Sequence, residues 1–360
     1  MKLLISCRDF GAAAQLQGFL HMCKENNDNF EFFVIVQEPS IEIMARFASI
    51  KLPASSAKIF TVVKNAFDFF QPDFCLFGLS GRGWGVDEAL LSYAKTCGVL
   101  TGTIQDYWGY IGSKDQNLYA DYYFVLDDLA VKLTAPKIPS TSKSVIVGSP
   151  KHEYLSTSIN KKRPLKKRKK TITFFLQPIW VHGVLANFST FISITNLLDK
   201  KKYNLEIRPH PSDRNNLSVR KLVSKSRLGI HIQKSEEYWQ SLLNSDYICT
   251  CFSTAGVDLK FAQQITKNTS GTLIYFWAGK DIKTSMREVI GLRRTPLLNK
   301  SLDHVLDSHF SAKNKFQKAL ERPKGLRRQV EEKMPIINGA SLGLAHQIKL
   351  SIQKSRRDIR

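Results

Sequence analysis

Two short motifs in the second half of the chain carry residue types that can bind a phosphate group. The first is Arg208-Pro209-His210-Pro211, which follows an apolar segment typical of a β-strand. Each proline fixes its own φ angle and lacks an N–H donor, so we expect Arg208 and His210 to project from a stiff turn. An imidazole there can donate to a phosphate oxygen or protonate one as it leaves. For this motif alone, an exposed histidine without a ligand is the alternative.

The second motif, Ser253-Thr254-Ala255-Gly256, stands where another apolar segment passes into a helical pattern. Its hydroxyls can cap the helix, and the free N–H groups of a helix start bind anions. The small Ala255 and Gly256 let a phosphate approach the backbone closely. Capping alone is the alternative, although one hydroxyl can cap while the other reaches a ligand. We predict that Ser253, Thr254 and Gly256 bind phosphate.

The two motifs together favour the ligand interpretation over the structural one. We therefore predict that His210 is catalytic and that Arg208 and Pro211 help to bind the leaving phosphate. Gln177 ends the first predicted strand of the second half and is expected to face the same site.

A glycine-rich segment, residues 78–88, follows a predicted strand and opens a helix in the first half. Its spacing matches neither the dinucleotide-binding GxGxxG pattern nor a P-loop. Asp87 and Glu88 fall in the first helical turn, where a carboxylate is favoured and stays ionised. Either one could be the general base for an acceptor hydroxyl, and a helix-start acidic pair without a catalytic role is the alternative. Arg82 and Asp106 are expected on the acceptor side.

The sequence offers no convincing metal site. Asp127-Asp128 ends a predicted strand and looks like a helix cap, and the six cysteines lack CxxC spacing. We therefore expect no metal ion and no cofactor, with a nucleotide-activated donor as substrate. Because the cysteines suggest no disulfide framework, a reducing, cytoplasmic environment is expected.

Short apolar segments alternate with helical periods along both halves of the chain, which predicts parallel sheets covered on both faces. The predicted strands of the first half are 2–7, 31–37, 74–80, 99–106, 121–128 and 144–149, and those of the second are 171–178, 203–209, 246–251 and 272–277. Predicted helices lie between them, for example at 41–49, 184–199 and 254–265. In such folds ligands bind at the carboxyl ends of the strands, where both motifs fall.

Length and charge predict two domains. The chain has 360 residues, 43% of them hydrophobic, and no run of about 18 apolar residues that could span a membrane. Residues 1–150 hold 13 Lys/Arg and 15 Asp/Glu, whereas the rest hold 40 and 16. We predict a Rossmann-like acceptor domain at 1–154, a basic linker at 155–170, a Rossmann-like nucleotide-binding domain at 171–335 and a basic C-terminal helix at 336–360, with the two domains facing a central cleft.

On these motifs the chain resembles GT-B glycosyltransferases, and more narrowly the bacterial CMP-sugar transferases of the sialyl and polysialyl type. His210-Pro211 and Ser253-Thr254 match that family's HP and S-S/T motifs in order and in the matching domain. The resemblance implies that His210 assists the departing CMP phosphate, that the Ser/Thr pair binds it and that an acidic residue deprotonates the acceptor. Asp87-Glu88-Ala89 lacks the glycine of the family's acidic motif. Similar strand-end patterns occur in CDP-glycerol glycerophosphotransferases and UDP-GlcNAc 2-epimerases.

The resemblance implies a metal-independent glycosyltransferase of bacterial surface polysaccharide synthesis that transfers a sugar from a CMP-linked donor to a glycan or lipid-linked acceptor. One alternative is transfer from another phosphorylated donor: CDP-glycerol, phosphoribosyl pyrophosphate or a UDP-sugar. Another is a non-catalytic basic protein that binds nucleic acid or an anionic membrane. Since the basic runs lack interleaved aromatics, we expect no nucleic-acid partner, and docking to the anionic inner face of the membrane explains the charge better.

Overall fold

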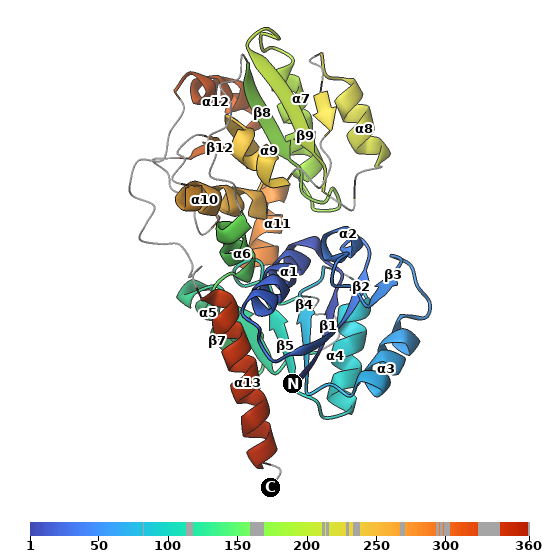
Figure 1. Ribbon diagram of the computed structural model, residues 1–360. Coiled ribbons are helices and arrows are strands. Elements are labelled where there is room, and N and C mark those ends of the chain that lie inside the picture. Colours follow the sequence, from blue (N-terminus) through green and yellow to red (C-terminus); the bar gives the residue numbers. More distant parts are fainter. Residues whose placement is uncertain are drawn as a thin grey trace. The chain divides into compact units, whose positions relative to one another are not determined.

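The computed structural model describes residues 1–358 except 82, 113–117, 159–168, 211–212, 214–215, 228–229, 233–237, 267–270, 293–294, 296–297, 299–302 and 323–338. The chain divides into two compact units, which we call unit 1 (Met1–Ser158 with Pro335–Arg360) and unit 2 (Ile159–Met334). Each unit has one parallel sheet with helices against it (Figure 1).

Unit 1 alternates strand and helix almost throughout. Its elements are β1 (Lys2–Cys7), α1 (Phe10–Glu25), β2 (Glu31–Gln37), α2 (Ile41–Met44), β3 (Ile50–Leu52), α3 (Ile59–Phe70), β4 (Phe74–Gly78), α4 (Val86–Thr96), β5 (Thr101–Ile104), β6 (Tyr122–Val125), α5 (Asp128–Thr134), a 3-10 turn (Ala135–Lys137), β7 (Lys143–Ile146), α6 (Pro150–Ser158) and, after unit 2, α13 (Ala340–Asp358). The strand order is β3-β2-β1-β4-β5-β6-β7, and every pair is parallel.

Two hydrophobic cores cover the two faces of this sheet. Successive side chains of a strand point to opposite faces, so Leu3 and Ile5 join one core and Leu4 joins the other. The first core includes α1 and α13, and the second includes α3 and α4. The C-terminal helix therefore completes unit 1, because Leu344 and Ile348 are fully buried in its core.

Unit 2 repeats the alternation. Its elements are β8 (Lys170–Phe175), α7 (Val184–Thr195), β9 (Tyr203–Arg208), α8 (Leu217–Ser224), β10 (Ile230–Ile232), α9 (Tyr238–Asn244), β11 (Tyr247–Thr250), α10 (Thr254–Thr266), β12 (Thr272–Phe276), α11 (Lys280–Ile290), β13 (His304–Leu306) and α12 (His309–Glu321). The sheet order is β10-β9-β8-β11-β12-β13, again parallel throughout. Phe174 of β8 packs against Phe188 and Phe191 of α7 and against Phe276 of β12.

The structure corrects several boundaries predicted from the sequence. The predicted linker at 155–170 is too long, because residues 155–158 end α6, Leu155 is buried in unit 1 and Lys170 begins β8. Residues 159–168 lie outside the described residues. The helix predicted at 41–49 spans only Ile41–Met44. Three strands of three residues each, β3, β10 and β13, were not predicted, since three residues are too few to show a period.

The described residues contain no helix that is both long enough and apolar enough to cross a membrane. All six cysteines are unpaired thiols, and five of them are buried.

Candidate functional site

Each sheet has a topological switch point beside its first strand. In unit 1 the chain moves from β1 outward to β2 and β3 and then returns to β4 on the other side of β1, and in unit 2 β8 and β11 stand in the same relation. Connections from two such strands leave in opposite directions, which opens a crevice at their carboxyl ends where ligands bind in this class of fold. Most of the predicted site residues follow the strands that border these two points.

The switch point of unit 2 is bridged by Gln177. Its Oε1 accepts a 2.7 Å hydrogen bond from the backbone N–H of Phe252, so the segment after β8 is tied to the segment after β11. The indole N–H of Trp277 donates to the carbonyl of Cys251 at 2.5 Å and holds the same turn from the β12 side. Gln177 is nearly buried, with 8% of its surface exposed. The sequence predicted that Gln177 ends the strand; in the structure β8 ends at Phe175, and Gln177 lies in the segment that follows.

The helix start that follows is shaped by Ser253. Its Oγ accepts from the N–H of Ala255 at 3.2 Å, and its carbonyl accepts from the N–H of Gly256 at 3.1 Å. Thr254 is the first residue of α10, and the first turn of this helix contains no acidic residue. A Cβ on Gly256 would lie 2.9 Å from the hydroxyl of Tyr275, so the glycine allows close packing against β12. Ser253 therefore caps the helix, and Gly256 has a packing role.

Arg208 and His210 lie at the end of β9, on the other side of β8. Arg208 is buried, with 8% exposed, and His210 is half-buried. The carbonyl of His210 accepts from the N–H of Asp213 at 2.8 Å, and Asp213 Oδ2 accepts from the N–H of Ile179 at 2.9 Å. These bonds close the turn after β9 and join it to the segment after β8. Pro211 lies outside the described residues.

The register places these groups along one edge of the sheet. Phe175 pairs with Arg208 on one side and with Thr250 on the other. Arg208 and the start of the Ser253 turn are therefore two strand spacings apart, roughly 10 Å. The segments that carry these groups therefore leave the sheet at one edge, on either side of β8.

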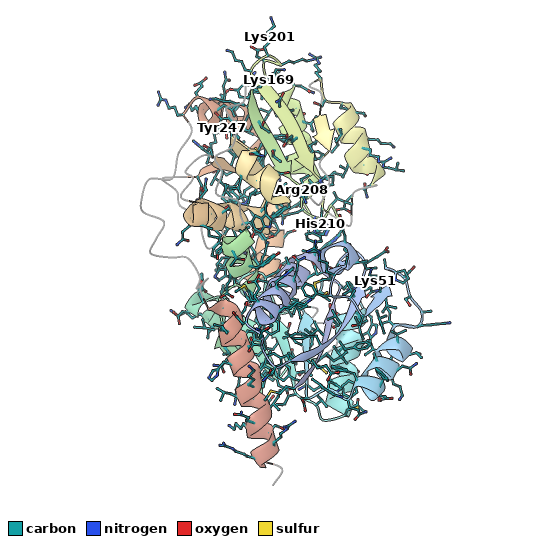
Figure 2. All side chains as sticks on the ribbon, viewed as in Figure 1. Lys51, Lys169, Lys201, Arg208, His210 and Tyr247 are labelled. Atoms are coloured by element: carbon teal, nitrogen blue, oxygen red, sulfur yellow. The ribbon has the colours of Figure 1, made fainter. Side chains whose placement is uncertain are left out.

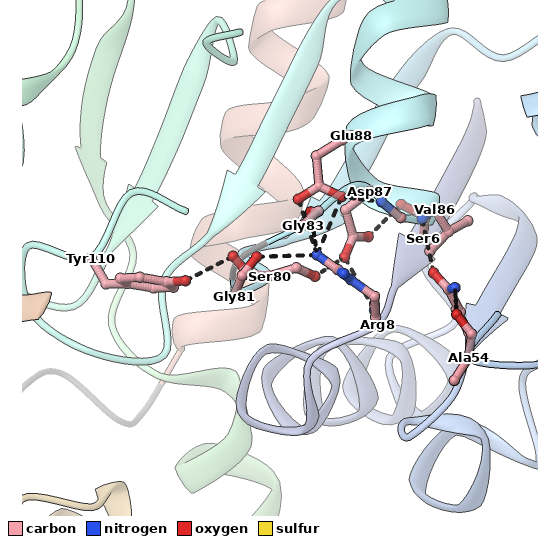
Figure 3. A network of polar contacts seen from close by, with 12 residues as sticks. Ser6, Arg8, Ala54, Ser80, Gly81, Gly83, Val86, Asp87, Glu88 and Tyr110 are labelled. Carbon is pink, nitrogen blue, oxygen red and sulfur yellow. Dashed lines mark hydrogen bonds and ion pairs between the residues drawn. The ribbon is translucent and has the colours of Figure 1, made fainter. Parts of the chain in front are cut away.

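The switch point of unit 1 is filled by the carboxylate of Asp87 (Figure 3). Asp87 Oδ1 accepts from Ser6 Oγ at 2.7 Å, and Oδ2 accepts from the N–H of Arg8 at 3.1 Å and from Ser80 Oγ. Only 2% of Asp87 is exposed. Burial raises the pKa of Asp87 to about 7, and the neighbouring Glu88 also raises it, while the two serine hydroxyls lower it. Asp87 thus ties β1 and β4 to α4.

Glu88 and Arg8 hold the glycine-rich segment. Glu88 Oε2 accepts from the N–H of Gly85 at 2.9 Å, and Arg8 Nη2 lies 3.3 Å from Glu88 Oε1. The same Arg8 nitrogen donates to the carbonyls of Gly81 and Gly83 at 3.1 and 3.0 Å. Burial raises the pKa of Glu88, whereas the Arg8 guanidinium lowers it. Arg82 lies outside the described residues.

Asp106 belongs to the same edge of unit 1. A Cβ on Gly11 would lie 2.0 Å from Asp106 Oδ2, so this carboxylate rests against the beginning of α1, where a negative charge is stabilised. The hydroxyl of Tyr110 donates to the carbonyl of Ser80 at 2.7 Å. The carboxyl edge of unit 1 therefore carries Asp87, Glu88 and Asp106, with Arg8 among them.

The structure groups the predicted residues into two sets, one in each unit. The carboxyl edge of the unit 2 sheet carries Gln177, Arg208, His210, Ser253, Thr254 and Gly256. The carboxyl edge of the unit 1 sheet carries Asp87, Glu88 and Asp106. Sequence reasoning missed Arg8, which stands directly after the first strand as a charged residue in an apolar context. It also missed Tyr238, which has no local signal in the sequence because its partners, Arg208 and Asp258, are 30 and 20 residues away.

The acidic pair predicted to cap a helix does so. Asp127 precedes α5, and its Oδ1 accepts from the N–H of Ala130 at 2.8 Å. Across the described part of the chain, no group of three or more His, Cys, Asp or Glu side chains could hold a metal ion.

No protein-family model matches the sequence, and no curated protein matches it. Solved structures do match in fold over the whole length. The UDP-GlcNAc 2-epimerase of Neisseria meningitidis, solved with UDP-GlcNAc bound, is 13% identical, with a TM-score of 0.68 over 97% of this chain and 100% of its own. MnaA of S. aureus, solved with UDP, is 15% identical, with a TM-score of 0.69 over 98% and 97%. A Listeria monocytogenes protein described as a UDP-N-acetylglucosamine 2-epimerase is 11% identical, with a TM-score of 0.69 over 98% and 97%.

These likenesses confirm the predicted fold class. The chain has two doubly wound parallel α/β units, the GT-B-like fold of the epimerase structures. At 11–15% identity they show the fold and do not show the activity.

Proposed function

We propose that this protein is an enzyme that acts on a nucleotide-activated sugar and binds the nucleotide phosphate at the carboxyl edge of unit 2. One observation carries the proposal: α10 begins at Thr254 with no carboxylate in its first turn, and Arg208 and His210 stand two strands away along the same edge. A helix start, a guanidinium and an imidazole form a set of donors suited to a phosphate.

The reaction that this arrangement serves best is glycosyl transfer, with phosphate as the leaving group. The acceptor hydroxyl attacks the anomeric carbon, the bond from that carbon to the phosphate oxygen breaks, and the nucleotide leaves with the electron pair. His210, Arg208 and the N–H groups at the start of α10 stabilise the negative charge that develops on the leaving phosphate. The acceptor proton goes to a carboxylate base.

The base in this proposal belongs to the acidic edge of unit 1. Asp87 has both oxygens occupied by hydrogen bonds and is buried, so its clearest task is to hold β1, β4 and α4 together. The side chain of Glu88 is 12% exposed, and Asp106 is half-buried at the end of β5. We propose Glu88 or Asp106 as the base, because these are the more accessible carboxylates of this edge, and we assign Asp87 a structural role.

The central test is His210→Ala, assayed with a donor panel of a CMP-linked 2-keto acid sugar, UDP-GlcNAc, CDP-glycerol and phosphoribosyl pyrophosphate. We expect kcat to fall about 100-fold or more, since loss of one general acid or oxyanion donor typically has that effect. His346→Ala on α13 is the matched control, because His346 is exposed on a helix of unit 1. Activity of His210→Ala within a few-fold of the wild type would remove the proposal.

The identity of the nucleotide is decided by a binding screen. A ligand that binds only the folded state raises the melting temperature, so CMP, UMP, CDP, UDP and pyrophosphate are compared by thermal shift. The order of the HP and S-S/T motifs leads us to expect CMP. A larger rise in melting temperature with UDP than with CMP would indicate that the donor is a UDP-sugar.

A second candidate reaction, 2-epimerisation of a UDP-sugar, is favoured by the whole-length likeness to a UDP-GlcNAc 2-epimerase solved with UDP-GlcNAc and to MnaA solved with UDP. The two reactions differ in their need for an acceptor. UDP-GlcNAc is incubated with the enzyme alone and followed by proton NMR. Appearance of a 2-epimer without any acceptor would select epimerisation, and conversion only with a glycan acceptor would select transfer.

A basic surface lies at the other end of unit 2. Five lysines adjoin the amino ends of β8 and β9: Lys169, Lys170, Lys200, Lys201 and Lys202. Lys169 and Lys201 are seen at the end of unit 2 away from Arg208 and His210 (Figure 2). We propose that this surface docks to anionic lipid head groups, where a basic residue near the membrane contributes about 1 kcal/mol. Replacement of Lys200–Lys202 by Gln should abolish co-sedimentation with phosphatidylglycerol vesicles at low salt. Unchanged co-sedimentation, or preference for RNA over vesicles, would contradict docking.

A further inference from the structure

Arg208 is held by an aromatic platform that the sequence did not suggest. Its guanidinium carbon lies 4.8 Å from the centroid of the Tyr238 ring, within the range of a cation–π contact. The ring itself is fixed by edge contacts to Phe175 at 5.8 Å and to Trp239 at 4.9 Å. A stacked guanidinium keeps its N–H groups in its own plane, so stacking orients these donors without using them.

Asp258 fixes the other end of the platform. The Tyr238 hydroxyl donates to Asp258 Oδ2, and Asp258 is 1% exposed. Burial raises the pKa of Tyr238 well above its ordinary value, and Asp258 raises it further, so the hydroxyl stays protonated and remains a donor at neutral pH. Asp258 lies one turn after Thr254 on α10. The contacts therefore join β9, α9 and α10, the elements that carry Arg208, Tyr238 and the helix start.

We propose that Tyr238 and Asp258 are positioning residues that orient Arg208 toward the phosphate of the bound nucleotide. This inference rests on the proposed function and deepens it, because the contacts from Arg208 to Tyr238 and from Tyr238 to Asp258 link the guanidinium to α10. Tyr238 holds the face of the guanidinium, and Asp258 holds Tyr238 and ties it to the helix that supplies the N–H donors. A buried arginine without such support would lose rotamer freedom at each binding event.

The test measures dissociation constants of pyrophosphate, CMP and UDP by calorimetry, with cytidine and uridine as probes without phosphate. Tyr238→Phe keeps the ring and removes the hydroxyl, and we expect the Kd of the phosphate probes to rise about 3- to 10-fold. Tyr238→Leu also removes the cation–π contact, and the expected rise is about 10- to 100-fold. Nucleoside binding should stay unchanged in both variants.

A double-mutant cycle separates positioning from general destabilisation. In an Arg208→Gln background, Tyr238→Phe should change the Kd of pyrophosphate less than about twofold, since the group that it positions is gone. For Asp258→Asn, the direction of the change in the Kd of pyrophosphate is the test. If the carboxylate acts through Tyr238, its removal weakens binding, whereas a carboxylate that only repels phosphate would give tighter binding on removal.

Tyr247→Phe is the matched control. Tyr247 also has a cation over its ring, Lys170 at 5.7 Å, and its hydroxyl donates to the carbonyl of Leu320 at 2.8 Å. It begins β11, at the opposite end of the sheet from Arg208 (Figure 2). We expect this variant to lose stability as Tyr238→Phe does but to bind the phosphate probes like the wild type.

The outcomes separate a failure of the positioning role from a failure of the proposed phosphate site. Wild-type affinity in Tyr238→Phe and Tyr238→Leu, with weakened binding in Arg208→Gln, would overturn the positioning role and leave the phosphate site standing. Tighter binding by Asp258→Asn would overturn the part assigned to Asp258. Wild-type affinity of Arg208→Gln for all three phosphate probes would remove the proposed site, and the positioning role with it.

Discussion

The two switch points have the same strand order and opposite electrostatics. Beside β1 and β4, the helix α4 begins with two carboxylates of its own, Asp87 and Glu88, and Asp87 satisfies donors from both strands. Beside β8 and β11, a neutral amide, Gln177, bridges the strand ends, and α10 begins without an acidic residue. A helix N-terminus favours a negative charge nearby. In unit 1 the protein places two of its own carboxyl groups there, whereas the first turn of α10 has none, and this is where we propose that the phosphate of a ligand binds.

The difference predicts which residue matters for folding and which for binding. A buried carboxyl group that accepts three hydrogen bonds is structural first, because its removal leaves buried donors without an acceptor. A neutral bridge beside an uncompensated helix start is suited to a site that must accept an anion reversibly. The following changes test this contrast, from the largest expected effect to the smallest.

Asp87→Ala should lower the free energy of unfolding by about 3–5 kcal/mol, since it removes the buried acceptor of three donors, Ser6, Ser80 and the N–H of Arg8. Urea denaturation measures the change. Asp128→Ala is the control, because Asp128 is exposed in the first turn of α5 and should contribute less than about 1 kcal/mol. A loss at Asp87 as small as that at Asp128 would mean that the unit 1 switch point does not depend on its carboxylate.

Gln177→Glu should separate binding from stability in unit 2. The carboxylate keeps an acceptor for the N–H of Phe252, so the free energy of unfolding should stay within about 1 kcal/mol of the wild type. The added negative charge lies beside the proposed phosphate and should raise the Kd of pyrophosphate about 10- to 100-fold. Gln177→Ala supplies the opposite pattern, with lower stability and a smaller change in affinity. Equal pyrophosphate affinity in Gln177→Glu and the wild type would place the anion elsewhere.

Particular residues show how much of this arrangement could be predicted from the sequence. The apolar alternation predicted the long strands and helices, and the position of glycine, serine and proline after strands predicted Gln177, His210 and Ser253 at one edge. The roles of Asp87 and Tyr238 could not be predicted, because each depends on contacts between segments that are 20 to 81 residues apart. A carboxylate in the first turn of a helix gives the same sequence pattern whether it caps the helix, acts in catalysis or links neighbouring strands by hydrogen bonds.

The pH dependence of stability gives a third test of the comparison. Since burial raises the pKa of Asp87 to about 7, above its value of roughly 4 in an unfolded chain, the folded state binds more protons between these values. Stability attributable to this group is therefore present at low pH and is lost as the pH rises toward 7, with a slope of at most about 1.4 kcal/mol per pH unit.

Asp87→Asn removes the titrating group from the same place. Urea denaturation between pH 5 and pH 8 should show a shallower decline in this variant than in the wild type. The same measurement on Gln177→Ala should show the wild-type slope, since that side chain does not titrate. A wild-type slope in Asp87→Asn would assign the pH dependence to another group.

The smallest effect is expected from Glu88→Gln. The amide oxygen can still accept from the N–H of Gly85, so the start of α4 keeps its cap, and only the charge opposite Arg8 is lost. Burial raises the pKa of Glu88 even beside Arg8, so the charged form gains little from folding, and Arg8 keeps two carbonyl acceptors; the change should therefore cost less than about 1 kcal/mol. If Glu88 is the acceptor base, however, kcat should fall about 100-fold or more while nucleotide affinity is unchanged. Steady-state kinetics beside urea denaturation therefore assign the residue: loss of rate without loss of stability makes Glu88 the base, and wild-type kcat transfers that role to Asp106.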